Sequence, residues 1–296
     1  MLDARGAPPI VRWGRIPPER MFPAHAAGIA VRFVKLPGGN YLRVVEAGPD
    51  SGPAVVMLHG WAASAYSFRH ALPALAAAGC RAIAIDLPGH GLSDKPLDPA
   101  WYTRDAMTLA VESILEAVEV GGATVVGHSM GGALALELAI TQSPRVRRVA
   151  LINPVGLAPV AFVRLARTSA LRVVAHGPVP RRLVKWLLRR AYSDPSLFTD
   201  QDVDEYWAPS QFAGFGEAMV NCLHAFSWDP VSQERLGTIR CPVLLVLATR
   251  DHLIHHAERG ARAIDDVVVT RVPGGHAVNE ESPLAVNSAL ITFARE

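Results

Sequence analysis

Cysteine is scarce in this sequence, and the three that occur, Cys80, Cys222 and Cys241, are far apart. An odd, widely spaced set provides neither a disulfide framework nor the paired spacing of a zinc site. Cys80 and Cys241 stand at the starts of apolar runs, where cysteine serves as a small core residue. We therefore expect no metal site, and no motif indicates a cofactor.

An excess of one charge is lacking too, because 29 basic residues face 27 acidic ones and leave a formal net charge of +2. That charge is too small to argue for nucleic acid as a partner. No long apolar run of the kind that a membrane-spanning helix needs is found. The first thirty residues hold five prolines and no uninterrupted apolar segment, so we expect no secretory signal and a cytoplasmic location.

Apolar runs of strand length alternate with longer helical patterns. Several runs are β-branched and apolar throughout, as in strands that are buried on both faces. The expected strands are 31–37, 41–48, 54–59, 81–86, 123–127, 148–153, 242–248 and 267–272, and the expected helices are 67–78, 104–118, 130–142, 255–264 and 283–293. The glycine-rich residues 38–40 indicate a hairpin between the first two strands. The alternation predicts an α/β fold with one open, mostly parallel sheet of about eight strands and helices on both faces.

Residues 154–229 break this alternation, because they contain helical patterns and no convincing strand. Such a block between two strands of one sheet predicts an inserted helical cap. We therefore expect an N-terminal extension over 1–30, a core formed by 31–153 and 230–296, and a cap over 154–229. Within the cap, the basic segment 164–190 is followed by an acidic one. The basic segment either binds weakly to an anionic membrane surface or is a solvated face balanced by the acids, and we favour the solvated face.

The run from 123 to 132 leads from a strand directly into a helix and contains the pattern Gly-His-Ser-Met-Gly at 127–131. The turn between such a strand and helix is so tight that only glycine fits on either side of the serine. It would hold Ser129 exposed at the carboxyl end of the sheet, where ligands of α/β proteins bind. The pattern therefore predicts that Ser129 is a nucleophile.

A serine hydroxyl needs a base, and the base needs an acid that orients it. His276 is the best placed of eleven histidines, because it lies in a loop between the last strand and the last helix. Asp251 follows the strand 242–248 at the same edge of the sheet. The alternative for Asp251 is a helix N-cap near Ile254. The oxyanion donors expected are the backbone N–H groups of Met130 and of Trp61, with Ala62 as the alternative to Trp61.

These motifs resemble the α/β-hydrolase superfamily over nearly the whole chain from about residue 31. The resemblance is carried by 59–61 (His-Gly-Trp), 86–93 (Asp-Leu-Pro-Gly-His-Gly-Leu-Ser), 127–132 (Gly-His-Ser-Met-Gly-Gly) and 275–276 (Gly-His) with Glu280 and Pro283. It implies the fold and the Ser129, Asp251, His276 triad, and it implies that 86–93 is a structural turn.

Ser129 argues against two branches of the superfamily, the haloalkane dehalogenases and the epoxide hydrolases of this fold, because those enzymes attack with a carboxylate. Residues 183–207 and 227–229 resemble the caps of serine-dependent C–C bond hydrolases and related esterases. Those C–C bond hydrolases usually have Asn directly before the nucleophile, where this sequence has His128. They also usually have Arg beside the cap tryptophan, whereas the neighbour of Trp207 in this sequence is Tyr206. The motifs at 59–61 and 128–132 resemble aryl esterases and cofactor-free haloperoxidase-like enzymes.

We expect a serine hydrolase that cleaves a small carboxylic ester with an apolar part, acting as a monomer or homodimer. Cap aromatics are candidates for the pocket lining, although such residues more often pack than bind; they are Trp207, Phe212, Phe215 and Trp228. The alternatives are a C–C bond hydrolase of a β-diketone-like substrate, a lactonase or an acyltransferase. The non-enzymatic alternative is a ligand receptor on the same fold.

Overall fold

The structure is a computed structural model that describes residues 16–24, 26–160, 163 and 179–296. Most of the extension expected over 1–30 and half of the basic segment 164–190 therefore lie outside the described residues. Within the described part, the first strand begins at Ile29, close to the expected start of the core. No helix in these ranges is both long enough and apolar enough to cross a bilayer.

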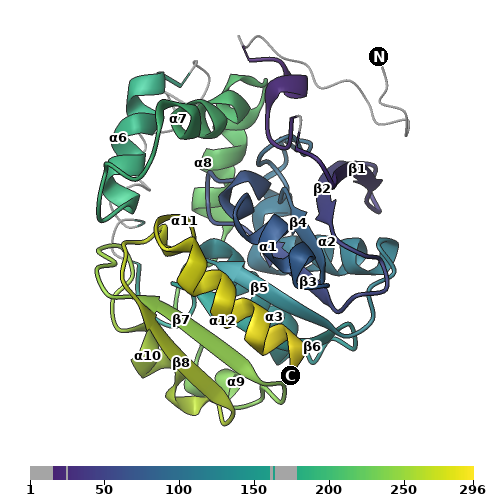
Figure 1. The fold of residues 1–296 in the computed structure, drawn as a ribbon, viewed down its shortest axis with the longest axis vertical. Coiled ribbons are helices and arrows are strands. Elements are labelled where there is room, and N and C mark those ends of the chain that lie inside the picture. The colour runs from purple at the N-terminus through teal and green to yellow at the C-terminus, as the bar shows by residue number, and fades with distance from the viewer. Residues whose placement is uncertain (1–15, 25, 161–162, 164–178) are drawn as a thin grey trace.

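One eight-stranded sheet runs through the molecule in the order β1-β2-β4-β3-β5-β6-β7-β8 (Figure 1). β2 pairs antiparallel with both of its neighbours, and the remaining strand pairs are parallel. The strands are β1 (Ile29–Lys35), β2 (Tyr41–Ala47), β3 (Ala54–Leu58), β4 (Arg81–Ile85), β5 (Ala123–His128), β6 (Val146–Ile152), β7 (Val243–Ala248) and β8 (Val267–Val272). The expected α/β-hydrolase sheet, including its first hairpin, is thus confirmed.

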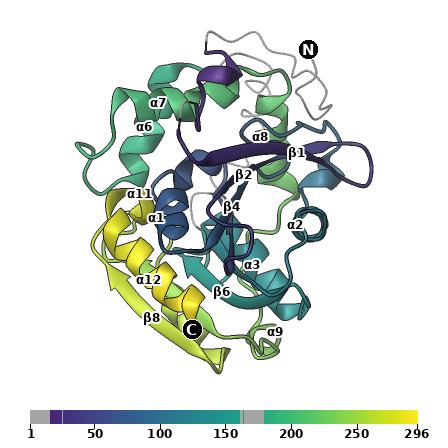
Figure 2. The same cartoon turned by 45° about the vertical axis from the view of Figure 1, so that its right-hand side comes forward.

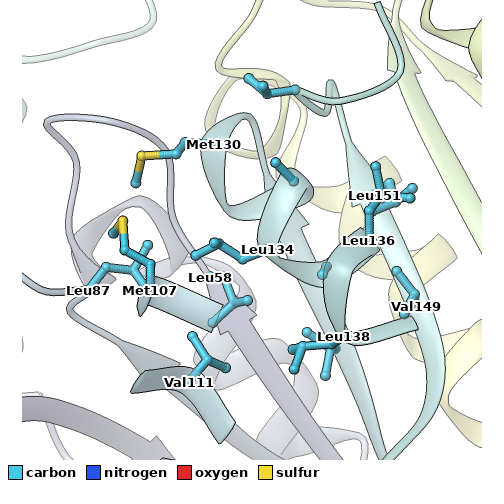
Figure 3. Packing of buried hydrophobic residues seen from close by; sticks show 14 of the residues in the cluster. Leu58, Leu87, Met107, Val111, Met130, Leu134, Leu136, Leu138, Val149 and Leu151 are labelled. Atoms are coloured by element: carbon cyan, nitrogen blue, oxygen red, sulfur yellow. The ribbon is translucent and has the colours of Figure 1, made fainter. Parts of the chain in front are cut away.

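Helices cover both faces of the sheet (Figure 2). α1 (Ala71–Ala77) and α12 (Pro283–Arg295) pack together on one face, and α2 (Arg104–Ala117) and α3 (Met130–Ile140) pack together on the other. Figure 3 shows the core on the second face, where Leu134 and Leu138 of α3 lie among side chains of β3, β6 and α2. α3 is buried along nearly its whole length, which fixes the position of its N-terminus.

Two expected helices are shorter than predicted. The helix expected over 67–78 divides into a 3-10 turn, η2 (Ala65–Phe68), and α1, because Pro73 fits only in the first turn of an α-helix. The helix expected over 255–264 becomes α10 (Ala257–Gly260) and a 3-10 turn, η5 (Ala261–Ala263). His256 precedes α10 with a left-handed φ of 64°, so the chain cannot enter that helix any earlier.

The segment between β6 and β7 is helical in its described residues, and we call these residues the helical insertion. It contains α6 (Arg181–Ala191), α7 (Asp200–Trp207), α8 (Phe215–Ala225) and α9 (Gln233–Leu236). Figure 1 shows α6 and α7 side by side, close to α11 (Val278–Glu281), which follows the loop that carries His276. The division of the chain into core and cap stays a prediction.

Candidate active site

Ser129 stands alone between β5 and α3, in the tight turn that the sequence pattern requires. Its φ of 52° and ψ of −115° lie outside the regions that a serine ordinarily adopts. A Cβ on Gly127 would lie 2.3 Å from the carbonyl oxygen of Gly131, and a Cβ on Gly131 would lie 2.1 Å from that of Leu58. The two glycines are therefore steric requirements of the turn.

Backbone hydrogen bonds hold this strained turn in place. The N–H of Ser129 donates to the carbonyl of Ile152 at 3.0 Å, and the carbonyl of Ser129 accepts from Gly132 and Val155, both at 2.9 Å. The turn is thus connected to the end of β6 as well as to α3. Such surrounding contacts are what allow a sparsely populated conformation to persist.

The structure brings Ser129, His276 and Asp251 together in one hydrogen-bonded chain. Nε2 of His276 lies 2.9 Å from Oγ of Ser129, and Nδ1 lies 2.9 Å from Oδ2 of Asp251. These distances fit an imidazole that donates from Nδ1 to the carboxylate and accepts the serine proton at Nε2. The three side chains come from the ends of β5, β7 and β8, so the parallel sheet itself assembles them.

Both oxygens of Asp251 are engaged, one by His276 and one by the backbone. Oδ1 accepts from the N–H groups of Leu253 and Ile254 at 2.7 and 3.1 Å, while Oδ2 faces His276. Burial acts to raise the pKa of Asp251, but the hydrogen bond and charge of His276 and the two N–H groups outweigh burial and lower it. The helix N-cap considered for Asp251 is not formed, because the next helix, α10, begins only at Ala257 and follows His256; the two N–H contacts belong to a turn.

The backbone of His276 is held by two side chains that composition and spacing did not single out. Nε2 of His128 lies 2.9 Å from the carbonyl oxygen of His276, and Nδ2 of Asn153 donates to the same oxygen at 3.0 Å. Burial and the neighbouring His276 lower the pKa of His128 to about 3, so its ring is neutral and donates from Nε2. Asn153 directly follows β6 and has a left-handed φ of 41°.

The loop expected to supply an oxyanion donor lies directly against Ser129. A Cβ on Gly60 would lie 3.1 Å from Cβ of Ser129, so the loop that carries Trp61 passes close to this serine, and the role of the Trp61 N–H stays a prediction. Met130 is the first residue of α3, and its N–H has no partner within that helix. Nε2 of His59 accepts from Leu87 and its Nδ1 faces the carbonyl of Gly60, which fixes the loop.

The four candidate lining aromatics lie in packed surroundings. Phe212 is 1% exposed and packs with Met21 and Leu92, and Trp228 is 4% exposed and donates to the carbonyl of Leu223. Phe215 belongs to the main core, and Trp207 donates from Nε1 to the carbonyl of Val179. These placements favour packing over ligand contact for Phe212 and Trp228. The indole of Trp61 donates to Met219 of α8.

A buried polar cluster that the sequence did not predict lies between α11 and the helical insertion. The carboxylate of Glu280 accepts from Tyr192 at 3.0 Å and from Tyr206, and it is paired with Arg69. Arg69 also pairs with Asp202 of α7 at 2.7 Å. Burial raises the pKa of Glu280, although Arg69 and the two hydroxyls oppose that shift. The cluster fastens the insertion to the segment just after His276.

Asp86 has a structural role, as the family resemblance implied. It is fully buried, and its carboxylate accepts from Ala65 at 2.7 Å and Leu92 at 2.8 Å and pairs with Arg43 at 3.0 Å. The two backbone contacts hold the segments at Ala65 and Leu92 in place, and the ion pair joins Asp86 to strand β2. Within the described residues, no group of three His, Cys, Asp or Glu side chains has the geometry to hold a metal ion.

The fold agrees with the comparison to protein families. The model of the alpha/beta hydrolase family matches residues 55–289. This chain therefore belongs to the alpha/beta hydrolase family.

Two curated relatives are 30% identical to the chain. One is the dihydrolipoyllysine-residue acetyltransferase component of the acetoin cleaving system of Pseudomonas putida, in a match that covers 88% of this chain and 68% of that protein. The other is the magnesium-chelatase 30 kDa subunit of Rhodobacter capsulatus, in a match that covers 80% of this chain and 85% of that protein. Each name describes the relative and not this protein.

Solved structures are similar over almost the whole chain. Cfl2 of Burkholderia cenocepacia is 26% identical with a TM-score of 0.80, over 92% of this chain and 98% of that one. CarC, a serine hydrolase involved in carbazole degradation, is 25% identical with a TM-score of 0.76, over 90% of this chain and 98% of that one.

Proposed function

We propose that this protein is a serine hydrolase that cleaves carboxylic esters with an apolar part through an acyl-enzyme. The observation that carries the proposal is the hydrogen-bonded chain from Oγ of Ser129 through the imidazole of His276 to Asp251, with 2.9 Å at each step. A hydroxyl nucleophile with a neutral base suits acyl transfer. It also argues against the two chemistries of this fold that require a carboxylate at the same position.

In the first half of the proposed reaction, Oγ of Ser129 attacks the ester carbonyl while its proton passes to Nε2 of His276. The negative charge that develops on the carbonyl oxygen is held by the N–H groups of Met130 and Trp61, at the positive end of α3. The C–O bond to the leaving alcohol then breaks, and the alcohol takes the proton from His276. Asp251 keeps the imidazole oriented and stabilises its charged form.

In the second half, His276 takes a proton from water and the hydroxide attacks the acyl carbon. The bond to Oγ breaks, the serine regains its proton, and the carboxylic acid leaves. No step requires a metal or a cofactor. Since the same acyl-enzyme opens lactones and transfers acyl groups, the reactions differ only in the acceptor and in the shape of the site.

The test is hydrolysis of p-nitrophenyl esters of graded chain length by the wild type and by Ser129→Ala. We expect the variant to lose a factor of about 10⁴ or more in kcat. Turnover that is unchanged in the variant would contradict the mechanism. A burst of p-nitrophenol equal to the enzyme concentration, present in the wild type and absent in the variant, would demonstrate the acyl-enzyme.

A panel of substrates separates the ester proposal from its alternatives. It contains a lactone, a vinylogous diketone for C–C cleavage, and an ester with added alcohol as an acyl acceptor. The proposal predicts that simple esters give the highest kcat/KM. A near single turnover with every substrate would instead favour a receptor that binds its ligand on this fold.

A further inference from the structure

The outer face of α6 exposes large apolar side chains. Leu183, Trp186 and Leu187 are 43%, 50% and 42% exposed. Their spacing of three and four residues places them along one stripe of the helix, while Val184 and Leu188 on the opposite side are buried in the helical insertion. α6 therefore has two apolar sides, one packed within the helical insertion and one exposed on the outside.

The same outer face carries positive charge. Arg182, Arg189 and Arg190 are all exposed, and the guanidinium of Arg190 lies over the ring of Trp186 at 4.9 Å. At about 100° per residue, these arginines and the apolar stripe share an arc of roughly 160° around the helix. The face thus combines cations, an indole and aliphatic groups, and α6 contains no acidic residue.

The acidic segment that follows α6 neutralises a different side of the helix. Asp204 pairs with Arg181 at 2.6 Å, and Asp200 pairs with Lys185 at 2.9 Å. The charge balance expected from the sequence is therefore present, but only on the flank against α7. In the part of the chain that the structure describes, no carboxylate is within salt-bridge distance of Arg182, Arg189 or Arg190. The outer face keeps its charge.

We propose that the outer face of α6 docks on the surface of an anionic lipid bilayer. Such a surface offers both kinds of contact that this face can make: phosphate groups for the arginines, and the boundary of the acyl chains for Trp186 and the leucines. Tryptophan prefers this interfacial depth, because its ring is apolar and its N–H is polar.

A second copy of the chain is the less suitable partner. The eleven residues of α6 span about 16 Å, whereas a stable protein interface takes about 20–30 residues from each side. Charge argues in the same direction, since two copies of this face would bring arginines against arginines. A bilayer has no minimum contact size and supplies negative charge.

The experiment is co-sedimentation of the full-length protein with vesicles of phosphatidylcholine alone and of phosphatidylcholine with phosphatidylglycerol, at low and high salt. We expect binding to the anionic vesicles at low salt that is at least tenfold stronger than binding to neutral vesicles or binding at high salt. Replacing Arg182, Arg189 and Arg190 together by Gln should remove this difference. The matched control, which loses the same charge elsewhere, replaces Arg240, Arg259 and Arg262 by Gln.

The apolar part of the face is tested separately. Brominated acyl chains should quench the emission of the wild type, and Trp186→Phe should remove most of that quenching while the circular dichroism stays the same. Leu187→Ser should weaken binding severalfold, whereas Leu284→Ser, at a site that is 88% exposed on α12, should not.

Three outcomes would overturn the proposal. They are absence of binding to anionic vesicles at low salt, equal loss of binding in the control triple variant, and a dimer in solution that Leu187→Ser dissociates. The third result would assign the face to a second copy of the chain. None of these measurements depends on the esterase activity, so the docking surface and the proposed reaction can fail independently.

Discussion

The carboxylate of Glu281 accepts a hydrogen bond at 2.6 Å from the backbone N–H of Gly275, the residue that precedes His276. Its second oxygen accepts from the N–H of Ser193 at 3.0 Å and from the hydroxyl of Ser193 at 2.6 Å. One side chain thus joins the loop of the proposed base to the helical insertion. The backbone N–H of Ala277 adds a further bond, to the carbonyl of Ala191 at 3.1 Å.

We predict that Glu281→Gln lowers kcat for ester hydrolysis about tenfold. An amide offers one accepting oxygen, so either the Gly275 or the Ser193 contact is lost, and a hydrogen bond to a charged group contributes about 1.5–3 kcal/mol. KM should change little if the effect is on the alignment of His276. The control is Glu258→Gln, a half-exposed side chain that pairs with Arg271. An equal loss in both variants would argue against the positioning role.

Replacing Asp251 by Asn tests the acid of the triad. The amide cannot accept from Nδ1 of His276 as the carboxylate does, so the imidazole is no longer held in the reactive tautomer. We expect kcat to fall by a factor on the order of 10³–10⁴. Folding should survive, since the amide oxygen can still accept from Leu253 and Ile254. Thermal unfolding of the variant checks this point, and a fall of less than tenfold in kcat would remove Asp251 from the mechanism.

Acid should destabilise the protein partly through His128. The pKa of this residue is lowered from its ordinary value of 6.5 to about 3 in the fold, because the ring is buried beside His276. The unfolded chain therefore binds a proton below pH 6.5 that the folded chain does not bind until about pH 3. By linkage, the free energy of unfolding falls as the pH is lowered through that range, by about 1.4 kcal/mol per pH unit for one such group.

The variant His128→Asn isolates this contribution. Its amide can donate to the carbonyl of His276 but does not titrate. Urea denaturation at several pH values between 6 and 4 should give a shallower pH dependence for the variant, by about 1.4 kcal/mol per unit. Parallel curves for the wild type and the variant would contradict the neutral, buried state of His128.

The strained turn around Ser129 predicts a pair of glycine substitutions with opposite results. Gly131→Ala places a methyl group 2.1 Å from the carbonyl oxygen of Leu58, so strand β3 or helix α3 has to move. We expect a loss of about 3 kcal/mol or more, or no folded protein. Gly121→Ala is the control, because a Cβ there meets nothing within 4 Å. The melting temperatures of the two variants measure this difference, and we expect a large decrease for Gly131→Ala and little change for Gly121→Ala.

Most of the sheet and the proposed triad could be predicted from the sequence, because the signals are local. β-branched apolar runs such as β7 indicate buried strands, and residues that follow parallel strands gather at one edge. The glycines around Ser129 fix the turn by sterics alone. The chain then needs only the parallel topology to bring Asp251 and His276 to the serine.

The contacts of the helical insertion could not be predicted in this way. Glu280 and Tyr206 are 74 residues apart, and neither lies in a pattern that announces the other. Asn153 was missed for a similar reason, because one side chain links β7 to the His276 loop without a motif. The packing partners of Phe212 could not be predicted either, because its neighbour Met21 lies in the expected N-terminal extension and not in the expected core.

Two contacts connect the loop of the proposed base to the end of α6. They are the hydrogen bond between Ala277 and Ala191 and the bridge through Glu281. A displacement of α6 would act on the loop of His276 through these bonds, whereas Ser129 is held by the backbone of Ile152 and Val155. Ser129 would stay in place while its proposed proton acceptor, His276, moved away. The distance between Oγ of Ser129 and Nε2 of His276 would then exceed the 2.9 Å of the present structure, so the proposed proton transfer depends on the position of α6.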